Sequence, residues 1–266
     1  MKFAIIGGAG KMGAAFVDGL LRSGEVNPDN IEVTARHSSS LEAISAKKLR
    51  STLDNAAAVQ KADIVVLAVG PEDVTAVLRD VQEYIGQVQL MVSIVTGVST
   101  SLIETMTGES LPIVRANPNI AALVSESATV ICRGSHARDE HVALARRLFA
   151  TLGVVEELDE RHMNVSTGLG GCGPAFVFKI IEAMSEGGVK MGMPRDVSCR
   201  IAAQVIKGAA ELVLTTGKHP AALKDEVTTP GGCTIDGIAK LQERGIAIAL
   251  IDAVETSSRK AGLLWE

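Results

Sequence analysis

The sequence has few aromatic side chains and no cysteine or histidine pattern that suggests a bound metal. Aromatic residues make up 3% of the 266 positions, which removes the stacking platforms that single-stranded nucleic acids require. Its cysteines and histidines form no C-x-x-C pair and no ligand cluster; they are Cys132, Cys172, Cys199, Cys233, His37, His136, His141, His162 and His219. We therefore expect no metal site and free thiols in a reducing compartment.

Long apolar runs and an excess of positive charge are also missing. No apolar stretch approaches the roughly 18 residues of a membrane span, and no signal-peptide pattern precedes the first predicted strand. The formal net charge is -5, with Lys and Arg scattered along the chain. We expect a cytoplasmic protein that binds neither nucleic acid nor membranes, while a small, locally bound anion remains compatible with this composition.

The pattern of apolar residues predicts two domains. Residues 1–158 contain repeated apolar strand segments, the first of them near-continuous, as in parallel strands covered by helices on both faces. We predict an α/β fold here, a Rossmann-type doubly wound sheet of about seven or eight strands. Residues 159–266 instead show helical spacing throughout, which predicts an all-helical second domain.

A glycine motif, GAGKMG at residues 8–13, follows the first predicted strand and opens a helix. In this context G-x-G-x-x-G binds the pyrophosphate of a dinucleotide. We expect Gly8 to make the tight turn, Gly10 to open the backbone amides, and Gly13 to let helix and strand pack closely. The predicted cofactor contacts in this motif are Gly8, Ala9, Gly10, Lys11 and Met12.

Later strand ends complete the predicted cofactor site. NAD-type sites place an acid roughly 20 residues beyond the glycines, but residues 35–39 of this chain contain none. Arg36 can bind a 2′-phosphate and Ser38 can add a neutral donor, so we predict NADPH, with NADH as the alternative. Asn117 and Asn119 either form an ordinary turn or face the nicotinamide. The remaining predicted cofactor contacts are Ala68, Val69, Gly70, Pro71, Asn117 and Asn119.

The helical half is more apolar than a small domain can bury. The segments IIEAMSEGGVKMG and IAIALIDAV are apolar around much of their circumference. A partner subunit would cover this excess, so we predict a homodimer formed through the helical domain.

The segment TTPGGCTIDG at residues 228–237 carries a proline and two glycines where the pattern otherwise predicts a helix. Pro230 is tolerated in a first helical turn, whereas each glycine weakens a helix by roughly 0.5–1 kcal/mol relative to alanine. Either a ligand approaches this backbone closely, or the segment is a weak helix start without a ligand. Bare amides at a helix N-terminus would suit an anion.

Six motifs together resemble the Δ1-pyrroline-5-carboxylate reductases, the last enzymes of proline biosynthesis. In chain order they are GGAGKMG, AVGPE, VSIVTGVS, IVRANPN, GGCGPAFVF and DEVTTPGGCTIDGI. The resemblance covers almost the whole chain. It implies a Rossmann domain followed by a helical dimerisation domain, NAD(P)H-dependent reduction of the C=N bond of a cyclic imino acid, and dimers that can assemble into larger rings.

The same resemblance assigns the TTPGGCT segment to the substrate. In the family the matching loop and helix start bind the substrate carboxylate, and the threonine matching Thr234 hydrogen-bonds near the ring nitrogen. It implies Thr234 as the catalytic residue, and substrate contacts from Pro230, Gly231, Gly232, Cys233 and Thr234. No His or Lys presents itself as an obligatory general acid.

The chain departs from the family pattern around the expected pocket. The family's A-V-K-P-Q is replaced at Gly70 and Glu72, and its M-P-N-T-P becomes residues 117–121, NPNIA. Further replacements that lose hydroxyl groups or a charge lie at Asn164, Gly170, Cys172 and Cys233. From the resemblance we expect Δ1-pyrroline-5-carboxylate as the substrate, and the departures leave a related cyclic imine, such as Δ1-pyrroline-2-carboxylate or a six-membered analogue, as the alternative.

Two other functions stay open at this point. The β-hydroxyacid dehydrogenases combine the same domain types, but their G-x-G-x-x-x-K-x-x-N pattern would place the catalytic lysine at Val177 and the asparagine at Ile180. Lys179 is out of register, and we interpret it as a solvated helix residue. The lost polar residues also suggest a non-catalytic NADP-binding protein.

Overall fold

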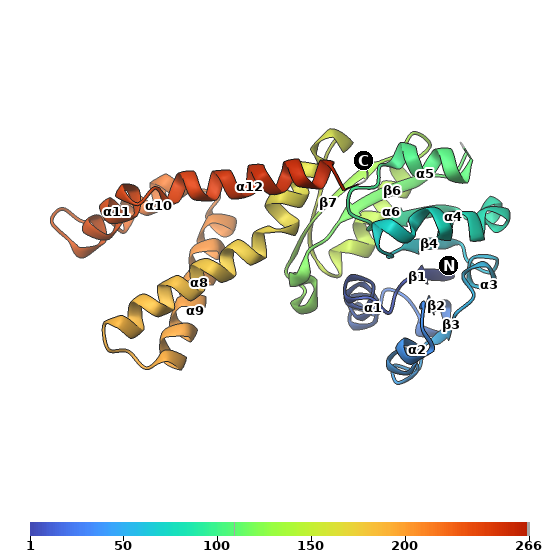
Figure 1. Ribbon diagram of the computed structural model, residues 1–266, viewed down its shortest axis with the longest axis horizontal. Coiled ribbons are helices and arrows are strands. Elements are labelled where there is room, and N and C mark those ends of the chain that lie inside the picture. Colours follow the sequence, from blue (N-terminus) through green and yellow to red (C-terminus); the bar gives the residue numbers. More distant parts are fainter. Residues whose placement is uncertain (109, 265–266) are drawn as a thin grey trace. The chain divides into compact units, whose positions relative to one another are not determined.

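The computed structural model describes residues 1–108 and 110–264, which form two compact units (Figure 1). The first unit comprises Met1–Cys172 together with the segment from Glu255 onward, and the second is Gly173–Val254. The boundary between the two units thus lies some residues after the end of the last strand. The C-terminal segment packs with the first unit. The domain boundary after residue 158 remains a prediction.

The first unit is built on one twisted sheet, which has eight strands within the described residues. The strands are β1 Phe3–Ile6, β2 Ile31–Thr34, β3 Arg50–Thr52, β4 Ile64–Leu67, β5 Leu90–Ser93, β6 Ile113–Asn117, β7 Ser127–Arg133 and β8 Gly153–Glu157. Their spatial order is β3-β2-β1-β4-β5-β6-β7-β8. Strands β1 to β6 are parallel, β7 is antiparallel to β6, and β8 is parallel to β7. The predicted Rossmann-type sheet is confirmed.

The chain reverses its direction of travel across the sheet between β1 and β4, and open α/β sheets bind ligands at such a point. Successive side chains of β1 enter opposite faces of the sheet, with Phe3 and Ile5 in one apolar cluster and Ala4 and Ile6 in the other. Both clusters are fully buried, as the near-continuous apolar strands predict.

Helices cover both faces of the sheet. They and the shorter turns of this unit are α1 Lys11–Ser23, η1 Pro28–Asn30, α2 Ser38–Ser45, α3 Asn55–Val59, η2 Pro71–Asp73, α4 Val74–Val81, η3 Gln82–Gln87, α5 Thr100–Thr107, η4 Ile120–Val124, α6 Asp139–Ala150, η5 Glu160–His162, α7 Met163–Ser166 and η6 Thr167–Gly171. Phe16 of α1 and Phe149 of α6 pack with ring centroids 5.0 Å apart on one face. Val74 and Leu78 of α4 and Ile103 of α5 are buried on the other.

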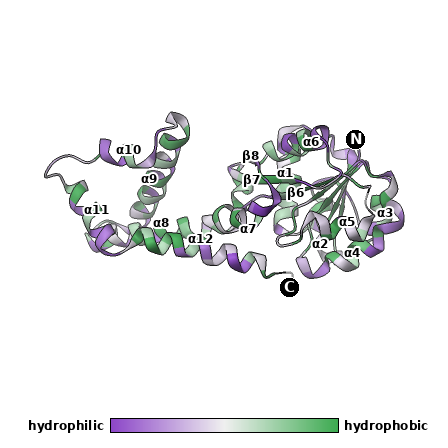
Figure 2. Cartoon of the chain, turned by 90° about the horizontal axis from the view of Figure 1, so that it is seen from above, coloured by the Kyte–Doolittle hydropathy of each residue, from purple (hydrophilic) through white to green (hydrophobic). Residues whose placement is uncertain are grey.

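The second unit is entirely helical in its described residues. Its helices are α8 Gly173–Lys190, α9 Arg195–Thr216, α10 Pro220–Glu226, α11 Cys233–Glu243 and most of α12, Ile246–Gly262, whose last turns belong to the first unit. Helices α8 and α9 pack as a pair, in which Ser198 Oγ donates to the Ser185 carbonyl at 2.8 Å. Many apolar side chains stay exposed, and hydrophobic stretches run along α8 (Figure 2).

None of the helices described by the structure is long and apolar enough to cross a membrane.

Candidate active site

The start of helix α1 is shaped to receive an anion. Gly10 is its N-cap, no side chain caps the first turn, and that turn contains no acidic residue. A Cβ atom added to Gly10 would come no closer than 3.3 Å to another heavy atom, the Gly7 carbonyl oxygen. The first backbone amides of α1 are therefore free to donate to a phosphate group.

The glycines at the start of α1 are required for different reasons, one for its backbone conformation and others for close packing. Gly7 adopts the left-handed conformation, with φ of +75°, and its added Cβ would lie 2.8 Å from the Ala68 carbonyl oxygen. Gly8 instead needs its small size, because an added Cβ would lie 2.7 Å from a Val33 methyl group. Gly8 is a central residue of the turn that the Gly10 amide closes on the Gly7 carbonyl at 2.9 Å, and Gly7 supplies the left-handed conformation that precedes it. The close packing at Gly13 is confirmed, with an added Cβ 2.6 Å from Gly8 Cα.

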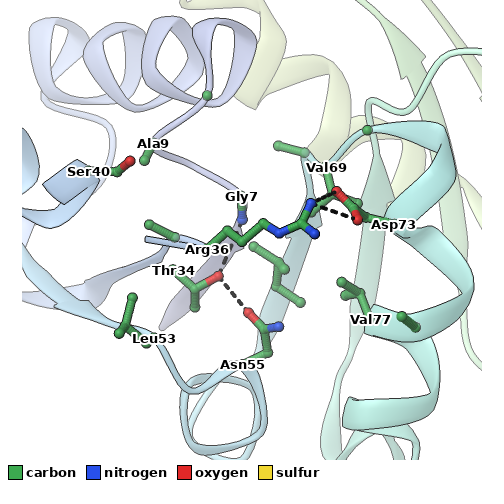
Figure 3. Close-up of a pocket in the computed structure, with 16 residues that line it drawn as sticks. Gly7, Ala9, Thr34, Arg36, Ser40, Leu53, Asn55, Val69, Asp73 and Val77 are labelled. Atoms are coloured by element: carbon green, nitrogen blue, oxygen red, sulfur yellow. Dashed lines mark hydrogen bonds and ion pairs between the residues drawn. The ribbon is translucent and has the colours of Figure 1, made fainter. Parts of the chain in front are cut away.

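A cavity of about 540 Å³ opens on one side of the α1 start, at the ends of β1 to β4 (Figure 3). We call it the β2–β4 cavity. It is lined by Ile6, Gly7, Ala9, Gly10, Thr34, Ala35, Arg36, Ser40, Leu53, Asn55, Ala68, Val69, Gly70, Asp73, Ala76 and Val77. Six predicted cofactor residues meet here, namely Ala9, Gly10, Arg36, Ala68, Val69 and Gly70.

The predicted residues Gly8, Lys11, Ser38 and Pro71 do not line this cavity, although all four lie in the described part of the chain. Gly8 borders a smaller neighbouring cavity. Ser40, two residues beyond Ser38, is the serine that lines the larger one. The offset arises because α2 begins at Ser38, and sequence spacing cannot distinguish among three successive serines.

Polar side chains link the strand ends around the β2–β4 cavity. Thr34 Oγ1 donates to Asn55 Oδ1 at 2.7 Å and accepts from the Gly7 amide at 3.3 Å. Arg36 Nη1 lies 3.2 Å from Asp73 Oδ1, so the predicted phosphate ligand already has an ionic partner. Sequence reasoning missed Thr34, Asn55 and Asp73. The only feature of the sequence that could have identified them as site residues is their position at, or shortly after, the end of a predicted parallel strand.

A second cavity of about 600 Å³ lies on the other side of the α1 start, where β5 and β6 end. We call it the β6–α12 cavity. Its lining residues are Met12, Thr96, Asn117, Pro118, Asn119, Ile120, Thr167, Gly171, Cys172, Thr256, Ser257, Lys260, Ala261 and Leu264. The structure thus brings the predicted Met12, Asn117 and Asn119 together, away from the predicted residues of the first cavity.

The Asn117 side chain holds the π-helix η6 through two hydrogen bonds. Its Nδ2 donates to Ser166 Oγ at 3.1 Å and to Thr167 Oγ1 at 3.2 Å. The Thr167 hydroxyl donates to the Met163 carbonyl at 3.0 Å, so it can only accept from Asn117. This fixes the orientation of the Asn117 amide. An added Cβ on Gly171 would lie 3.9 Å from Asn117 Oδ1 and 4.0 Å from Nδ2, so the Asn117 amide lies beside Gly171 in the wall of the cavity.

Asn119 acts on the same segment. Its Nδ2 donates to the Gly170 carbonyl at 3.0 Å, and its Oδ1 accepts from the Ala121 amide at 2.9 Å. Its amide and carbonyl groups are therefore both engaged within the protein. A cofactor contact from Asn119 remains a prediction, and the geometry supports a positioning role for its side chain.

The end of α12 closes one side of the β6–α12 cavity, a contribution that the sequence did not reveal. Gly97 has φ of +82°, and its added Cβ would lie 3.1 Å from Leu264 Cβ. A Cβ added to Gly262 would lie 3.2 Å from Asn164 Nδ2, so this glycine also packs closely. Lys260 is exposed and brings a positive charge to the cavity wall, which suits an anionic ligand.

The TTPGGCT loop lies in the second unit and gathers all five predicted substrate residues before and at the start of α11. The helix begins at Cys233 with Gly232 as N-cap and no side-chain cap. Pro230 therefore lies in the preceding turn, and the expectation of a proline in the first helical turn is wrong. Gly231 has φ of +66°, while an added Cβ on Gly232 would meet Thr229 Oγ1 at 2.3 Å. The backbone conformation requires glycine at residue 231, the contact with the Thr229 side chain favours a small residue at 232, and the first turn of α11 has no side-chain cap.

The groups with shifted pKa values in the described residues lie outside both cavities. Burial, reinforced by the charge of Glu160, raises the pKa of the Cys132 thiol to about 12. Burial lowers the pKa of His141 below its ordinary value. Lys179, the nearest lysine to the dehydrogenase pattern, is exposed on α8 and pairs with Glu182 at 2.5 Å.

Comparison with known proteins gives consistent matches along the chain. Residues 160–264 match the family model described as pyrroline-5-carboxylate reductase dimerisation, and residues 2–97 match the model described as NADP oxidoreductase, coenzyme F420-dependent. A pyrroline-5-carboxylate reductase of Methanosarcina acetivorans is 42% identical over 96% of this chain and 94% of its own length.

Solved structures agree with these sequence matches. A pyrroline-5-carboxylate reductase from Coxiella burnetii superimposes with a TM-score of 0.92 at 30% identity, covering 100% of this chain and 98% of that one. A Plasmodium falciparum pyrroline carboxylate reductase, solved with NADP bound, gives a TM-score of 0.89 at 27% identity, with coverage of 100% and 98%.

Proposed function

The chain belongs to the pyrroline-5-carboxylate reductase family, and on this premise we propose that it reduces Δ1-pyrroline-5-carboxylate to L-proline with NADPH or NADH. The observation that carries the proposal is that two helices begin without a side-chain cap, so their first amides can bind an anion. Helix α1 begins beside two cavities, and α11 begins directly after the TTPGGCT loop. One suits a dinucleotide pyrophosphate and the other a small carboxylate.

The residues around α1 fit a nicotinamide dinucleotide. The α1 amides would hold the pyrophosphate, the β2–β4 cavity would hold the adenosine half, and Arg36 would meet a 2′-phosphate. The β6–α12 cavity would then receive the nicotinamide, where the Asn117 carbonyl can accept a hydrogen bond from the carboxamide. The bound cofactor supplies the hydride that reduces the C=N carbon.

The TTPGGCT loop would bind the substrate. Its carboxylate would accept hydrogen bonds from the backbone amides of Gly232, Cys233 and Thr234, with Pro230 and Gly231 shaping the turn. The Thr234 hydroxyl would hold the imine nitrogen. A protonated imine is already electrophilic, so the protein need not supply a strong acid. It must align the substrate ring with the nicotinamide.

A related cyclic imine is the second candidate substrate, because the chain departs from the family pattern inside the site. Asn117, which stands where the family has a methionine, lines the β6–α12 cavity together with Cys172, which stands where the family has a serine. These changes alter the hydrogen-bonding groups that a ring would meet. We further propose a cytoplasmic homodimer that can assemble into a larger ring.

Purified protein should oxidise NADPH with Δ1-pyrroline-5-carboxylate and form proline. The assay runs beside Δ1-pyrroline-2-carboxylate, a six-membered imine and an enzyme-free control. Efficient turnover of the first substrate supports the proposal. Turnover of another imine alone would identify a paralogue, and NADPH binding without any turnover would identify a binding protein.

The role of Thr234 is tested by Thr234→Ala beside Thr234→Ser. Loss of a hydrogen bond to a charged nitrogen corresponds to about 1.5–3 kcal/mol, so kcat/KM should fall roughly 10- to 100-fold in the alanine variant. The serine variant keeps the hydroxyl and should retain most activity. Equal activity of the alanine variant would remove Thr234 from the mechanism.

A further inference from the structure

The ion pair between Arg36 and Asp73 joins two strand ends across the β2–β4 cavity. Arg36 follows β2, and Asp73 ends the short helix η2 that follows β4. Arg36 Nη1 lies 3.2 Å from Asp73 Oδ1 and 3.4 Å from Oδ2, and both side chains line the cavity. Figure 3 shows the Arg36 side chain extended toward Asp73, with dashed lines marking the contact.

This contact engages only one edge of the guanidinium group. Arginine carries five N–H donors, and the recorded bonds to Asp73 all come from Nη1. The Arg36 side chain is 73% exposed and that of Asp73 is 35% exposed. A ligand can therefore reach the remaining donors, and an exposed pair of this kind is weak enough to be displaced by a phosphate group.

The two dinucleotides should respond to this pair in opposite ways. A 2′-phosphate is attracted by the guanidinium and repelled by a carboxylate beside it, whereas a ribose hydroxyl can donate to a carboxylate. Asp73 thus competes with the 2′-phosphate of NADPH for Arg36. It does not weaken the binding of NADH, which carries a hydroxyl at this position.

We propose that Asp73 is a specificity-determining residue that restrains the preference for NADPH over NADH by holding Arg36. The inference rests on the proposed cofactor site and concerns only its adenosine half. The neighbouring acid, Glu72, provides a matched comparison. It lies in the same short helix η2, but its carboxylate lies against Gly70, where an added Cβ would be 2.6 Å from Oε1, and no recorded contact joins it to Arg36 in the described residues.

The test measures binding of NADPH and NADH to the full chain by fluorescence or calorimetry, without any imine, at low ionic strength where charge screening is weak. In the Asp73→Asn variant the ratio of the NADH Kd to the NADPH Kd should rise about two- to fivefold, the range expected for one exposed charge pair. Glu72→Gln should change this ratio less. In an Arg36→Ala background the effect of Asp73→Asn should become clearly smaller, because only the direct repulsion between the carboxylate and the 2′-phosphate remains.

The proposal is overturned if Asp73→Asn leaves the ratio unchanged, if Glu72→Gln raises it equally, or if the rise is undiminished without Arg36. Thermal melting curves of each variant establish that it is folded. Because binding is read without substrate, a failure of imine reduction does not affect the result. A protein that binds neither dinucleotide would instead refute the cofactor site itself.

Discussion

Single side chains at the strand ends hold the two cavities in shape. Asn117 shows this most clearly, because it stands where the family pattern has methionine and donates to both Ser166 and Thr167. These three polar groups form a local network between β6 and the segment that leads into η6. A buried network of this kind stabilises a structure only when all of its members are satisfied.

Asn117→Leu should therefore lower the free energy of unfolding by about 1–3 kcal/mol, because the Ser166 and Thr167 hydroxyls lose their donor. Urea unfolding curves measure this change. Gln87→Leu, an exposed amide with no recorded side-chain hydrogen bond in the described chain, should shift stability by less than about 0.5 kcal/mol. Equal stability of Asn117→Leu and the unmodified protein would contradict the network.

At the scale of elements, helix starts carry most of the specific chemistry. Helices α1 and α11 both begin after glycine-rich turns with no side-chain cap, whereas α6 has a capping box in which the Arg138 amide donates to His141 Nδ1 at 3.0 Å. The difference has a physical basis. A capped start is satisfied internally, and an uncapped one leaves donors for a ligand.

Gly13→Ala should weaken both stability and dinucleotide binding. Its Cβ would lie 2.6 Å from Gly8 Cα, so the α1 start must move, at a cost of about 1–3 kcal/mol. Thermal melting and NADPH titration measure the two effects. Gly86→Ala is the control, because an added Cβ there meets nothing within 4 Å. A Gly13→Ala protein that binds NADPH normally would show that the close packing is dispensable.

The capping box of α6 should make stability depend on pH. Burial lowers the pKa of His141, so the unfolded chain takes up a proton at a higher pH than the folded chain. Stability is therefore retained above the ordinary histidine pKa near 6.5 and is lost as pH falls below it. Loss of this cap corresponds to about 1 kcal/mol.

Melting temperatures at intervals from pH 7.5 to 5 measure this dependence. His141→Gln keeps an acceptor at the capping position but does not titrate, so its stability should fall less over the same interval. Parallel curves for the two proteins would contradict the role of His141.

At the scale of the whole molecule, the second unit buries little of its own apolar surface. Ile201, Val205 and Leu212 of α9 are 47%, 51% and 54% exposed, and Ile248 and Ile251 of α12 are 66% and 63% exposed. This surface lies within the match to the dimerisation family model, residues 160–264. The excess of apolar residues in the sequence is thus explained by burial against a second subunit.

Ile251→Glu should dissociate the homodimer or weaken it by at least about tenfold in Kd, because it places a charge in a surface that association must desolvate. Light scattering during size-exclusion chromatography measures the molar mass. Lys61→Glu, on an exposed lysine of the first unit, introduces the same side chain and should leave the dimer intact. A fully dimeric Ile251→Glu protein would place the interface elsewhere.

The sequence by itself determined the classes of element and the family. Near-continuous apolar strands, the glycine motif and the ordered motifs of the C-terminal half depend on local spacing, which is readable along the chain. They correctly predicted the Rossmann-type sheet and the helical second half, while the assignment of Ala9, Gly10, Arg36 and Ala68 to a cofactor stays a prediction.

Only the tertiary structure decided which groups share a cavity and which already form ion pairs or hydrogen bonds within the protein. The pairing of Arg36 with Asp73, the contribution of Lys260, and the tethering of η6 by Asn117 all join residues from different elements. The turn at Gly7 likewise depends on contact with Ala68 of the neighbouring strand end. Distances across a sheet are set by strand order and packing, and these are properties of the folded chain that local sequence spacing does not encode.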